Sequence, residues 1–372
     1  MTTELITANT VTAHEHIGFE LGWDYAHYRL VPPAPYAQEP SALRNGLLAG
    51  QAAFGARTLP PTRPVRKWLQ LRLHAWLRGR SVELMQVTPH YLQQLDVSHC
   101  PITRVSLSNA TLDSSDASVD RVRNDAGYAA GNLAVMSTKA NHAKAGYGFQ
   151  DALRFVKQIE AGKLGGIDGL NAAQWSRVAV LCSFVEPMSH DDACLIPLLV
   201  MPPNRLRLFN PVQALQAFIS QQLLAPGWSH RAARFEALLP GKPVRRAFLT
   251  FFHALLPRVL EASRNGGLQT RWAIEDAWRN PLVLKRWTAF ARLLTAAQCE
   301  ELVARATAKK LGSLRIQQLP DEAATEGWNL DSRGYVPHAV LMKRAPRIVH
   351  AVASEQRTVE PAQAPMQASL PL

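Results

Sequence analysis

The feature that most constrains the fold of this chain is the spacing of apolar residues along residues 151–345. Apolar side chains recur there every three or four positions between proline and glycine breaks, which is the period of amphipathic α-helices. The pattern predicts helices over residues 151–161, 171–184, 211–224, 243–262, 280–294 and 295–310. Asn171 and Thr295 are suited to cap the first turn of a helix, and two other ranges have proline near their start. The chain is therefore predicted to be mainly helical.

The breaks between these patterns divide the chain into segments. We expect a helical N-terminal region at residues 1–90, a small module with strands at 91–150, a helical domain at 151–345 and a disordered tail at 346–372. Within the first segment, residues 31–40 are rich in proline and are expected to form an extended connector. The expected fold class is α+β, predominantly α-helical, with the small module inserted between helical regions.

Positive charge is unevenly distributed along the chain. The formal net charge is +12 and the pI is near 9.9, which favours a polyanionic partner such as DNA, RNA or an anionic membrane. A basic surface with no dedicated partner is the alternative. No acidic residue lies between Glu39 and Glu83. That interval contains Arg44, Arg57, Arg63, Arg66, Lys67, Arg72, Arg78 and Arg80.

A basic amphipathic helix is predicted at residues 64–80. Its apolar face contains Val65, Trp68, Leu69, Leu73 and Trp76. The opposite face contains Arg66, Lys67, Gln70, His74 and Arg78. This second face is either a solvated surface or a contact for phosphate groups. Arg72 falls near the apolar face, and we expect its stem to lie along that face with the guanidinium in water.

Several function classes are disfavoured by what the sequence lacks. The four cysteines form no CxxC pair, so no zinc finger is predicted and a reducing compartment is favoured. The N-terminus has no signal-peptide pattern, and charges interrupt the most apolar stretch, residues 178–202. We therefore expect a cytoplasmic protein without a membrane partner. No phosphate-binding loop of the GxxxxGK type is present, which argues against a nucleotide-hydrolysing motor.

Two acidic clusters are weak candidates for chemistry. Residues 190–194 contain His, Asp, Asp and Cys, but their spacing matches no zinc site, and a solvated loop is expected there. Glu275 and Asp276 are expected on the exposed side of an amphipathic helix rather than as an acid pair.

Residues 100–146 have a pattern of their own. It predicts a short strand at Cys100–Leu107, a polar loop at Ser108–Asp116, a second strand at Ser118–Val122, a turn at Asn124–Gly127 and a helix at Leu133–Lys144 that stops at Gly146. Packing this helix across the strands could bring Asp120 and Asn141 together. Their side-chain oxygens are hard ligands suited to a magnesium ion, which can hold a phosphodiester and stabilise the charge that develops during its cleavage.

This stretch resembles the HNH, or His-Me finger, nuclease module with its ββα-metal fold. It is similar to the bacterial and phage subgroup whose first motif is Ser-x-Asp-Arg and whose loop is Gly-Tyr-x-x-x-Asn. The matching residues are Ser118, Asp120, Arg121, Gly127, Tyr128 and Asn132, continuing into Asn141 and Lys144. The opening residues Cys100–Thr103 also resemble the start of that module. The resemblance covers residues 100–146 of the 372-residue chain.

The resemblance implies a role for each matching residue. Asp120 and Asn141 would bind magnesium or manganese, and Asn132 would hold the loop that orients the site. Lys144 would contact phosphate, and the cations expected to assist it in binding nucleic acid are Arg123, Lys139, Arg66, Lys67 and Arg78.

Arg121 departs from the wider family, which usually has a histidine there as general base. Arginine stays charged near neutral pH and cannot accept a proton, but it can hold a phosphate by two hydrogen bonds. The base would then be His142, His99 or a metal-bound hydroxide. His142 follows Asn141 directly, so it points about 100° away around the helix.

Three functions are compatible with these observations. The first is the function that we predict, a metal-dependent endonuclease, which is a hydrolase that cleaves nucleic acid, with DNA favoured over RNA; the other two are alternatives. The second is a nucleic-acid-binding protein whose HNH-like module has lost cleavage. The third is a helical protein-interaction module that uses its basic face against an acidic partner.

Overall fold

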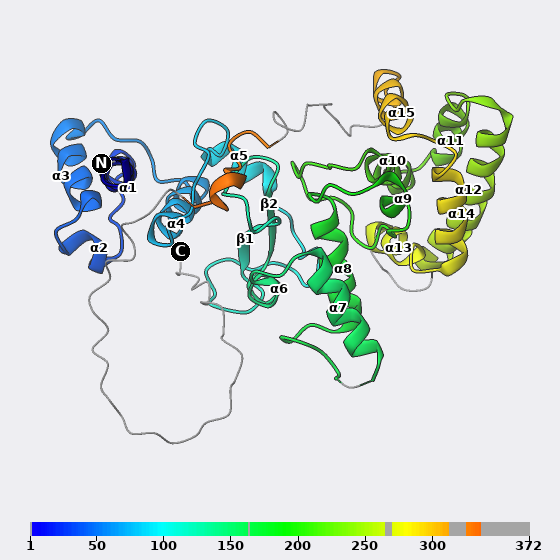
Figure 1. Ribbon diagram of the computed structural model, residues 1–372, viewed down its shortest axis with the longest axis horizontal. Coiled ribbons are helices and arrows are strands. Elements are labelled where there is room, and N and C mark those ends of the chain that lie inside the picture. The colour runs from blue at the N-terminus through cyan, green and yellow to red at the C-terminus, as the bar shows by residue number, and fades with distance from the viewer. Residues whose placement is uncertain (1, 163, 265–269, 312–324, 336–372) are drawn as a thin grey trace. The chain divides into compact units, whose positions relative to one another are not determined.

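The computed structural model describes residues 2–162, 164–264, 270–311 and 325–335 (Figure 1). These residues are predominantly helical and contain one two-stranded antiparallel sheet. The α-helices are α1 (Thr2–His27), α2 (Ala34–Gln38), α3 (Ala42–Phe54), α4 (Arg63–Leu77), α5 (Pro89–Leu95), α6 (Thr138–Lys144), α7 (Phe149–Glu160), α8 (Ala172–Ser183), α9 (His190–Ala193), α10 (Pro211–Gln221), α11 (Trp228–Glu236), α12 (Gly241–Arg264), α13 (Thr270–Ala277), α14 (Pro281–Ala291) and α15 (Ala296–Ala308). The strands are β1 (Ala117–Arg121) and β2 (Leu133–Ser137), and the short 3₁₀ helices are η1 (Gln222–Leu224) and η2 (Leu330–Ser332). The predicted tail at 346–372 lies outside the described residues.

The chain divides into two compact units, and each is built from stretches that are separate in sequence. Among the described residues, unit 1 contains residues 2–98, 107–146 and 325–335. Unit 2 contains residues 99–106 and the described part of 147–311. This grouping differs from the four sequence segments, because residues 99–106 belong with the helical unit and residues 325–335 belong with the strands. None of the described helices combines the length and the apolar character that crossing a bilayer requires.

In unit 1, the N-terminal helices α1, α3 and α4 pack around one apolar cluster. It contains Leu21, Tyr25, Ala26, Leu43, Leu47, Val65, Leu69 and Leu73, with Trp68 and Trp76 packed at its border. The predicted apolar face of the basic helix is therefore confirmed. Gly22 and Gly46 let α1 and α3 approach closely, because a Cβ at either position would collide with the backbone of the other helix.

Two expectations for this region are wrong. The proline-rich stretch contains the short helix α2, because Pro35 lies in its first turn, where proline's missing N–H needs no partner. Arg72 does not extend into water. Its side chain is buried, forms an ion pair with Asp24 of α1 and lies over the ring of Trp68. The nearby carboxylate satisfies the guanidinium inside the cluster, so the side chain has no need to reach solvent.

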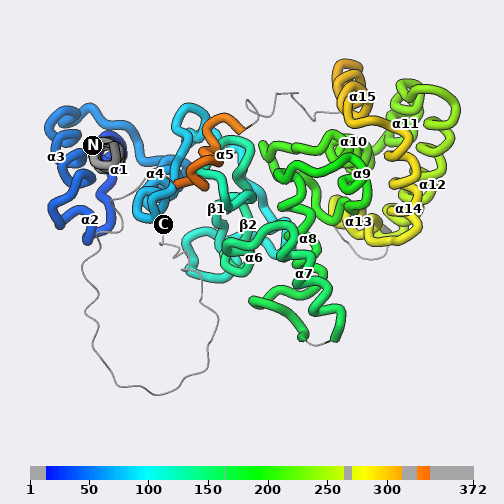
Figure 2. The backbone as a smooth tube through the Cα atoms, viewed as in Figure 1, coloured from blue at the N-terminus to red at the C-terminus, as the bar shows by residue number. Residues whose placement is uncertain are grey.

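A second apolar cluster attaches the sheet to the helices of unit 1. It contains Leu71 and Ala75 of α4, Leu92 and Leu95 of α5, and Leu133 and Val135 of β2, together with Val87 and Tyr128. The path of the backbone from α5 through the sheet to α6 can be followed in Figure 2. This packing fixes the sheet against α4 and α5, and α6 follows β2 without a break.

The local structure of residues 100–146 differs from the expectation in two places. Cys100–Leu107 is not a strand: only His99 and Ser106 form an isolated bridge, and the chain turns between them. The expected helix at Leu133–Lys144 is divided, because Leu133–Ser137 pairs with β1 and the helix begins only at Thr138. All five residues of β2 are buried, and such a short apolar run fits a buried strand as well as a helix. The observed order is strand, strand, helix, over residues 117–144, hereafter the β1–β2–α6 segment.

Unit 2 consists of helices whose core is aromatic. The ring of Phe251 on α12 lies 5.3 Å from that of Trp287 on α14, and Trp278, just after α13, lies 5.5 Å from Trp287. The helices predicted in this region are confirmed, with Asn171 and Thr295 as N-caps of α8 and α15. Residues 190–193 form the short helix α9 rather than an irregular loop, because Ser189 caps its first turn.

Glu275 is not on an exposed face. It is buried, contacts Arg104 and Arg271 at 3.2 Å each, and accepts a hydrogen bond from the amide of Met201. Arg104 also donates two hydrogen bonds to Asp276. These bonds hold residues 99–106 against the helices of unit 2. They explain why this stretch belongs to unit 2, although the strands that follow it in sequence belong to unit 1.

Candidate functional site

The β1–β2–α6 segment places the residues singled out by the sequence motif on two neighbouring elements. Asp120 and Arg121 end β1, where they pair with Ala134 and Leu133 of β2. Asn141 and Lys144 lie one turn apart on α6. Ser137 caps α6 at the point where β2 ends, and the helix lies next to both strands (Figure 1). The two ends of the motif therefore meet.

The ammonium of Lys144 contacts the carboxylate of Asp120. Lys144 Nζ lies 3.0 Å from Asp120 Oδ2, and the two side chains are 0% and 1% exposed. Lys144 Nζ also donates to the carbonyl of Arg121 at 2.9 Å and to Oδ1 of Asn124 at 3.4 Å. Burial raises the pKa of Asp120, and the charges of Lys144 and Arg121 oppose that rise. A buried cation thus accompanies the buried carboxylate.

Asn141 provides a second link between α6 and β1. Its Nδ2 donates to the hydroxyl of Ser118 at 2.7 Å. Asn141 is 1% exposed, so this amide, like Lys144, lies inside unit 1. The two residues that close α6 onto β1 are therefore also the two that the resemblance assigns to metal and phosphate.

The ion pair with Lys144 opposes a magnesium ion at Asp120, although both oxygens of this carboxylate are buried without a hydrogen-bond partner among the described residues. A divalent cation bound to this carboxylate would face the ammonium of Lys144, and like charges repel strongly where water is excluded. Magnesium also keeps several of its waters, whereas both side chains are buried. Within the described residues, no group of three or more His, Cys, Asp or Glu side chains gathers at a metal-binding distance.

Arg121 is used inside the turn that follows β1. Its Nη1 donates to the carbonyls of Asn124 and Ala126, at 3.1 and 2.8 Å, and its guanidinium lies over the ring of Tyr128. The side chain is buried. In this arrangement the guanidinium of Arg121 binds the backbone of residues 124–126 and does not face solvent.

Asn132 closes the same turn from the other side. Its Oδ1 accepts from the amide of Arg123 at 2.8 Å, and its Nδ2 donates to the carbonyls of Arg123 and Gly127 at 3.0 Å each. The residue is fully buried. These three bonds fix the loop between β1 and β2.

Residues 325–335 cover this loop. The sequence did not predict this contact. The amide of Gly127 donates to the carbonyl of Trp328, and Trp328 Nε1 donates to the carbonyl of Ala130. The amide of Ser81 donates to the carbonyl of Gly334. A Cβ at Gly127 would collide with Ser81, so glycine is required there by close approach. No local signal in the sequence joins segments so far apart.

The two histidines considered as bases have different surroundings. His142 is exposed on α6, whereas Asp120 is buried. His99 belongs to unit 2, where its ring packs edge-on against that of Trp272 at 5.3 Å. These surroundings therefore identify neither histidine as a general base.

The cations expected to contact nucleic acid differ in their exposure and in their bonding partners. Arg66 and Lys139 are exposed. Lys67 pairs with Asp96 at 3.2 Å, and Arg123 makes two hydrogen bonds to Asp125. Arg78 is half-buried at the end of α4. Of the named set, Arg66 and Lys139 thus present the most accessible charge, while Lys144 presents none.

The exposed cations stand beside one polar loop, residues 108–116. Arg63, one turn before Arg66, donates to the side chain of Asn109. On the other side of the loop, the amide of Lys139 donates to the carbonyl of Ser114. The first turns of α4 and α6 are therefore connected through this loop.

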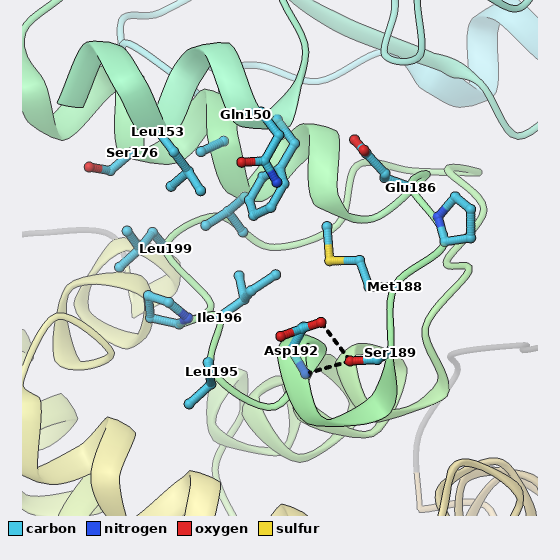
Figure 3. A pocket seen from close by; sticks show the side chains of 15 residues that line it. Gln150, Leu153, Ser176, Glu186, Met188, Ser189, Asp192, Leu195, Ile196 and Leu199 are labelled. Atoms are coloured by element: carbon cyan, nitrogen blue, oxygen red, sulfur yellow. Dashed lines mark hydrogen bonds between the residues drawn. The ribbon is translucent and has the colours of Figure 1, made fainter. Parts of the chain in front are cut away.

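Unit 2 contains a separate pocket of about 710 Å³. Figure 3 shows Leu153, Met188, Ile196 and Leu199 pointing into it. Asp192, at its edge, exchanges hydrogen bonds with Ser189 as part of the cap of α9. Apolar side chains make up most of the lining, and its two carboxylates are Asp192, which is engaged in the helix cap, and Glu186.

No family model, curated protein or solved structure matches this chain. The β1–β2–α6 segment, with its residue pattern and geometry, is therefore the feature of this chain that bears on function.

Proposed function

We propose that this chain is a nucleic-acid-binding protein whose β1–β2–α6 segment is an HNH-like module without cleavage activity. The observation that carries the proposal is the ion pair between Lys144 and Asp120. In the module that this segment resembles, Asp120 would hold a metal ion, and here the ammonium of Lys144 forms an ion pair with the carboxylate instead. A lysine ammonium can balance the charge of the carboxylate, but it cannot activate a water molecule as a bound metal does.

The positive surface supports binding to nucleic acid. Arg66 and Lys139 are exposed at the first turns of α4 and α6, on either side of loop 108–116. Cations spaced along a polar loop are suited to contact successive phosphate groups, with an affinity that falls as salt rises. DNA is the partner that the resemblance favours.

The competing candidate is a magnesium-dependent endonuclease. It is favoured by the position of Asp120 and Asn141, whose side chains lie on adjacent elements at the spacing of the resembled motif. This candidate requires Lys144 to release Asp120 and water to enter, since both side chains are buried.

A cleavage assay on the full chain distinguishes the two. Supercoiled plasmid and single-stranded oligonucleotides are incubated with the wild type and with Asp120→Ala, in magnesium or manganese. The proposal expects no metal-dependent cleavage by either protein. Cleavage by the wild type that Asp120→Ala abolishes would establish the endonuclease instead.

A binding assay tests the other half of the proposal. Anisotropy of labelled DNA is measured with the wild type, with Arg66→Ser/Lys139→Ser, and with Arg154→Ser/Lys157→Ser as a control of equal charge on the exposed face of α7. The first pair should weaken binding and the control should not. If the wild type binds neither DNA nor RNA at low salt, the result overturns this proposal and favours a protein-interaction module.

A further inference from the structure

A basic groove lies between helices α12 and α14 of unit 2. It has a volume of about 530 Å³ and is lined by Lys242, Pro243, Arg246, Ala247, Thr250, Arg286 and Ala289. Lys242, Arg246 and Thr250 follow one another at four-residue intervals, so they share a face of α12. Arg286 faces them from α14, with which α12 packs. The small side chains of Ala247 and Ala289 leave the hollow open.

The three cations of this groove have no structural partner among the described residues. Lys242, Arg246 and Arg286 are exposed, and none forms an ion pair or donates a side-chain hydrogen bond to a described group. By contrast, Arg104, Arg231, Arg258 and Arg271 of the same unit all donate to carbonyl or carboxylate oxygens. The groove therefore gathers cations that the fold itself does not use.

Acidic residues are absent from both walls. The sequence contains no aspartate or glutamate from Ala237 to Leu260 or from Ala277 to Cys299. Like charges four residues apart on a helix repel one another, so Lys242 and Arg246 destabilise α12 slightly unless an anion lies between them. A narrow groove with one sign of charge also concentrates the field and attracts anions.

We infer that this groove binds the phosphate backbone of nucleic acid and gives unit 2 a contact of its own. The inference rests on the proposed function but concerns residues that the HNH resemblance does not include. Guanidinium groups from Arg246 and Arg286 approach from two walls, which suits two neighbouring phosphates, and Lys242 adds a third charge to the lining. Backbone contacts of this kind position nucleic acid without reading its sequence.

The test uses the full chain with a charge-matched control. One variant carries Lys242→Ser, Arg246→Ser and Arg286→Ser. The control carries Lys157→Ser, Arg305→Ser and Lys309→Ser, which are exposed cations of the same unit away from the groove. Affinity for labelled double- and single-stranded oligonucleotides of mixed sequence is measured between 50 and 200 mM NaCl (about the range over which phosphate contacts are lost). Circular dichroism confirms that both variants fold.

The groove variant should bind about tenfold more weakly than the wild type, and the slope of log K against log salt should fall by about 2 to 3. The control should change affinity less than about threefold. Equal losses in both variants, or an unchanged groove variant, would overturn the inference while leaving the proposed function in place. If the wild type binds no oligonucleotide, the proposed function itself fails.

A competition arm separates nucleic acid from a small phosphorylated ligand. Inorganic phosphate and pyrophosphate are titrated into the wild-type complex. We expect either anion to displace the oligonucleotide only at concentrations high enough to raise the ionic strength of the solution. Tight binding of pyrophosphate that the groove variant loses, with oligonucleotide binding unaffected, would assign the groove to a small anion instead.

Discussion

The ammonium of Lys144 lies 3.0 Å from the carboxylate of Asp120 in the interior of unit 1, and this pair joins α6 to the end of β1. Removing both charges from water costs free energy, which is offset in part by their mutual attraction and by the bonds from Lys144 to Arg121 and Asn124. The pair is therefore sensitive to the loss of either partner.

Lys144→Met should destabilise the protein by about 3–5 kcal/mol, because Asp120 would remain buried without its cation. Lys139→Met, on the same helix but exposed, should change the free energy of unfolding by no more than about 0.5 kcal/mol. The double variant Asp120→Asn/Lys144→Met should lose less than the sum of the two single variants. Urea unfolding followed by tryptophan fluorescence is measured for the wild type, for the single variants Asp120→Asn, Lys144→Met and Lys139→Met, and for the double variant. Equal losses for the two lysines would contradict the pairing.

Gly127→Ala should destabilise unit 1 by about 1–3 kcal/mol, since the added methyl group would collide with Ser81 and separate the loop from residues 325–335. Gly146→Ala is the control, because a Cβ there would meet no described atom within 4 Å. The midpoint of thermal unfolding should be clearly lower for Gly127→Ala than for Gly146→Ala. If Gly127→Ala were as stable as Gly146→Ala, the loop would be able to shift and accommodate the added methyl group.

Stability should depend on pH through His74. Burial lowers the pKa of His74 from 6.5 to about 4, and the charge of Arg78 acts in the same direction. Between these values the unfolded chain binds more protons than the folded protein, so this contribution is fully present above pH 6.5 and is lost as pH falls toward 4. Between pH 7 and pH 4, the free energy of unfolding should fall more steeply in the wild type than in His74→Gln, by on the order of 2 kcal/mol. Urea titrations at intervals of pH measure this difference, and parallel curves would argue against it.

Arg104→Ala should destabilise unit 2 by about 2–4 kcal/mol, because Glu275 would lose one of its two cations and Asp276 would lose two hydrogen bonds. Arg279→Ala is the control. Its guanidinium lies 3.8 Å from Asp276 at an exposed position, and its loss should cost about 0.5 kcal/mol or less. Similar urea midpoints for the two variants would mean that residues 99–106 are held by other contacts.

The helices of unit 2 could be predicted from the sequence because their signals are local. Asn171 and Thr295 each stand three residues before a glutamine, and both pairs form reciprocal caps. The strand at Leu133–Ser137 could not be distinguished from the start of a helix, because its five apolar or small residues have no period. Pairing with β1 decides its conformation.

The candidate site could be located but its internal bonds could not be predicted. The motif indicates that Asp120 and the helix bearing Asn141 and Lys144 lie close together, and they do. Which of the two helix residues would face the carboxylate depends on side-chain packing and burial. Arg104 illustrates the same limit: its partners Glu275 and Asp276 lie far along the chain, and no pattern within either segment indicates the contact.

The position of Trp328 has a consequence for how the protein is made. Residues 325–335 are translated after all of unit 2, yet they cover the Gly127 loop of unit 1. A growing chain folds its parts in the order in which they leave the ribosome. Unit 2 can therefore be complete while unit 1 still lacks its last stretch, with the loop that Asn132 closes exposed on the nascent chain. A chaperone or partner present during synthesis would meet a surface that the finished protein conceals.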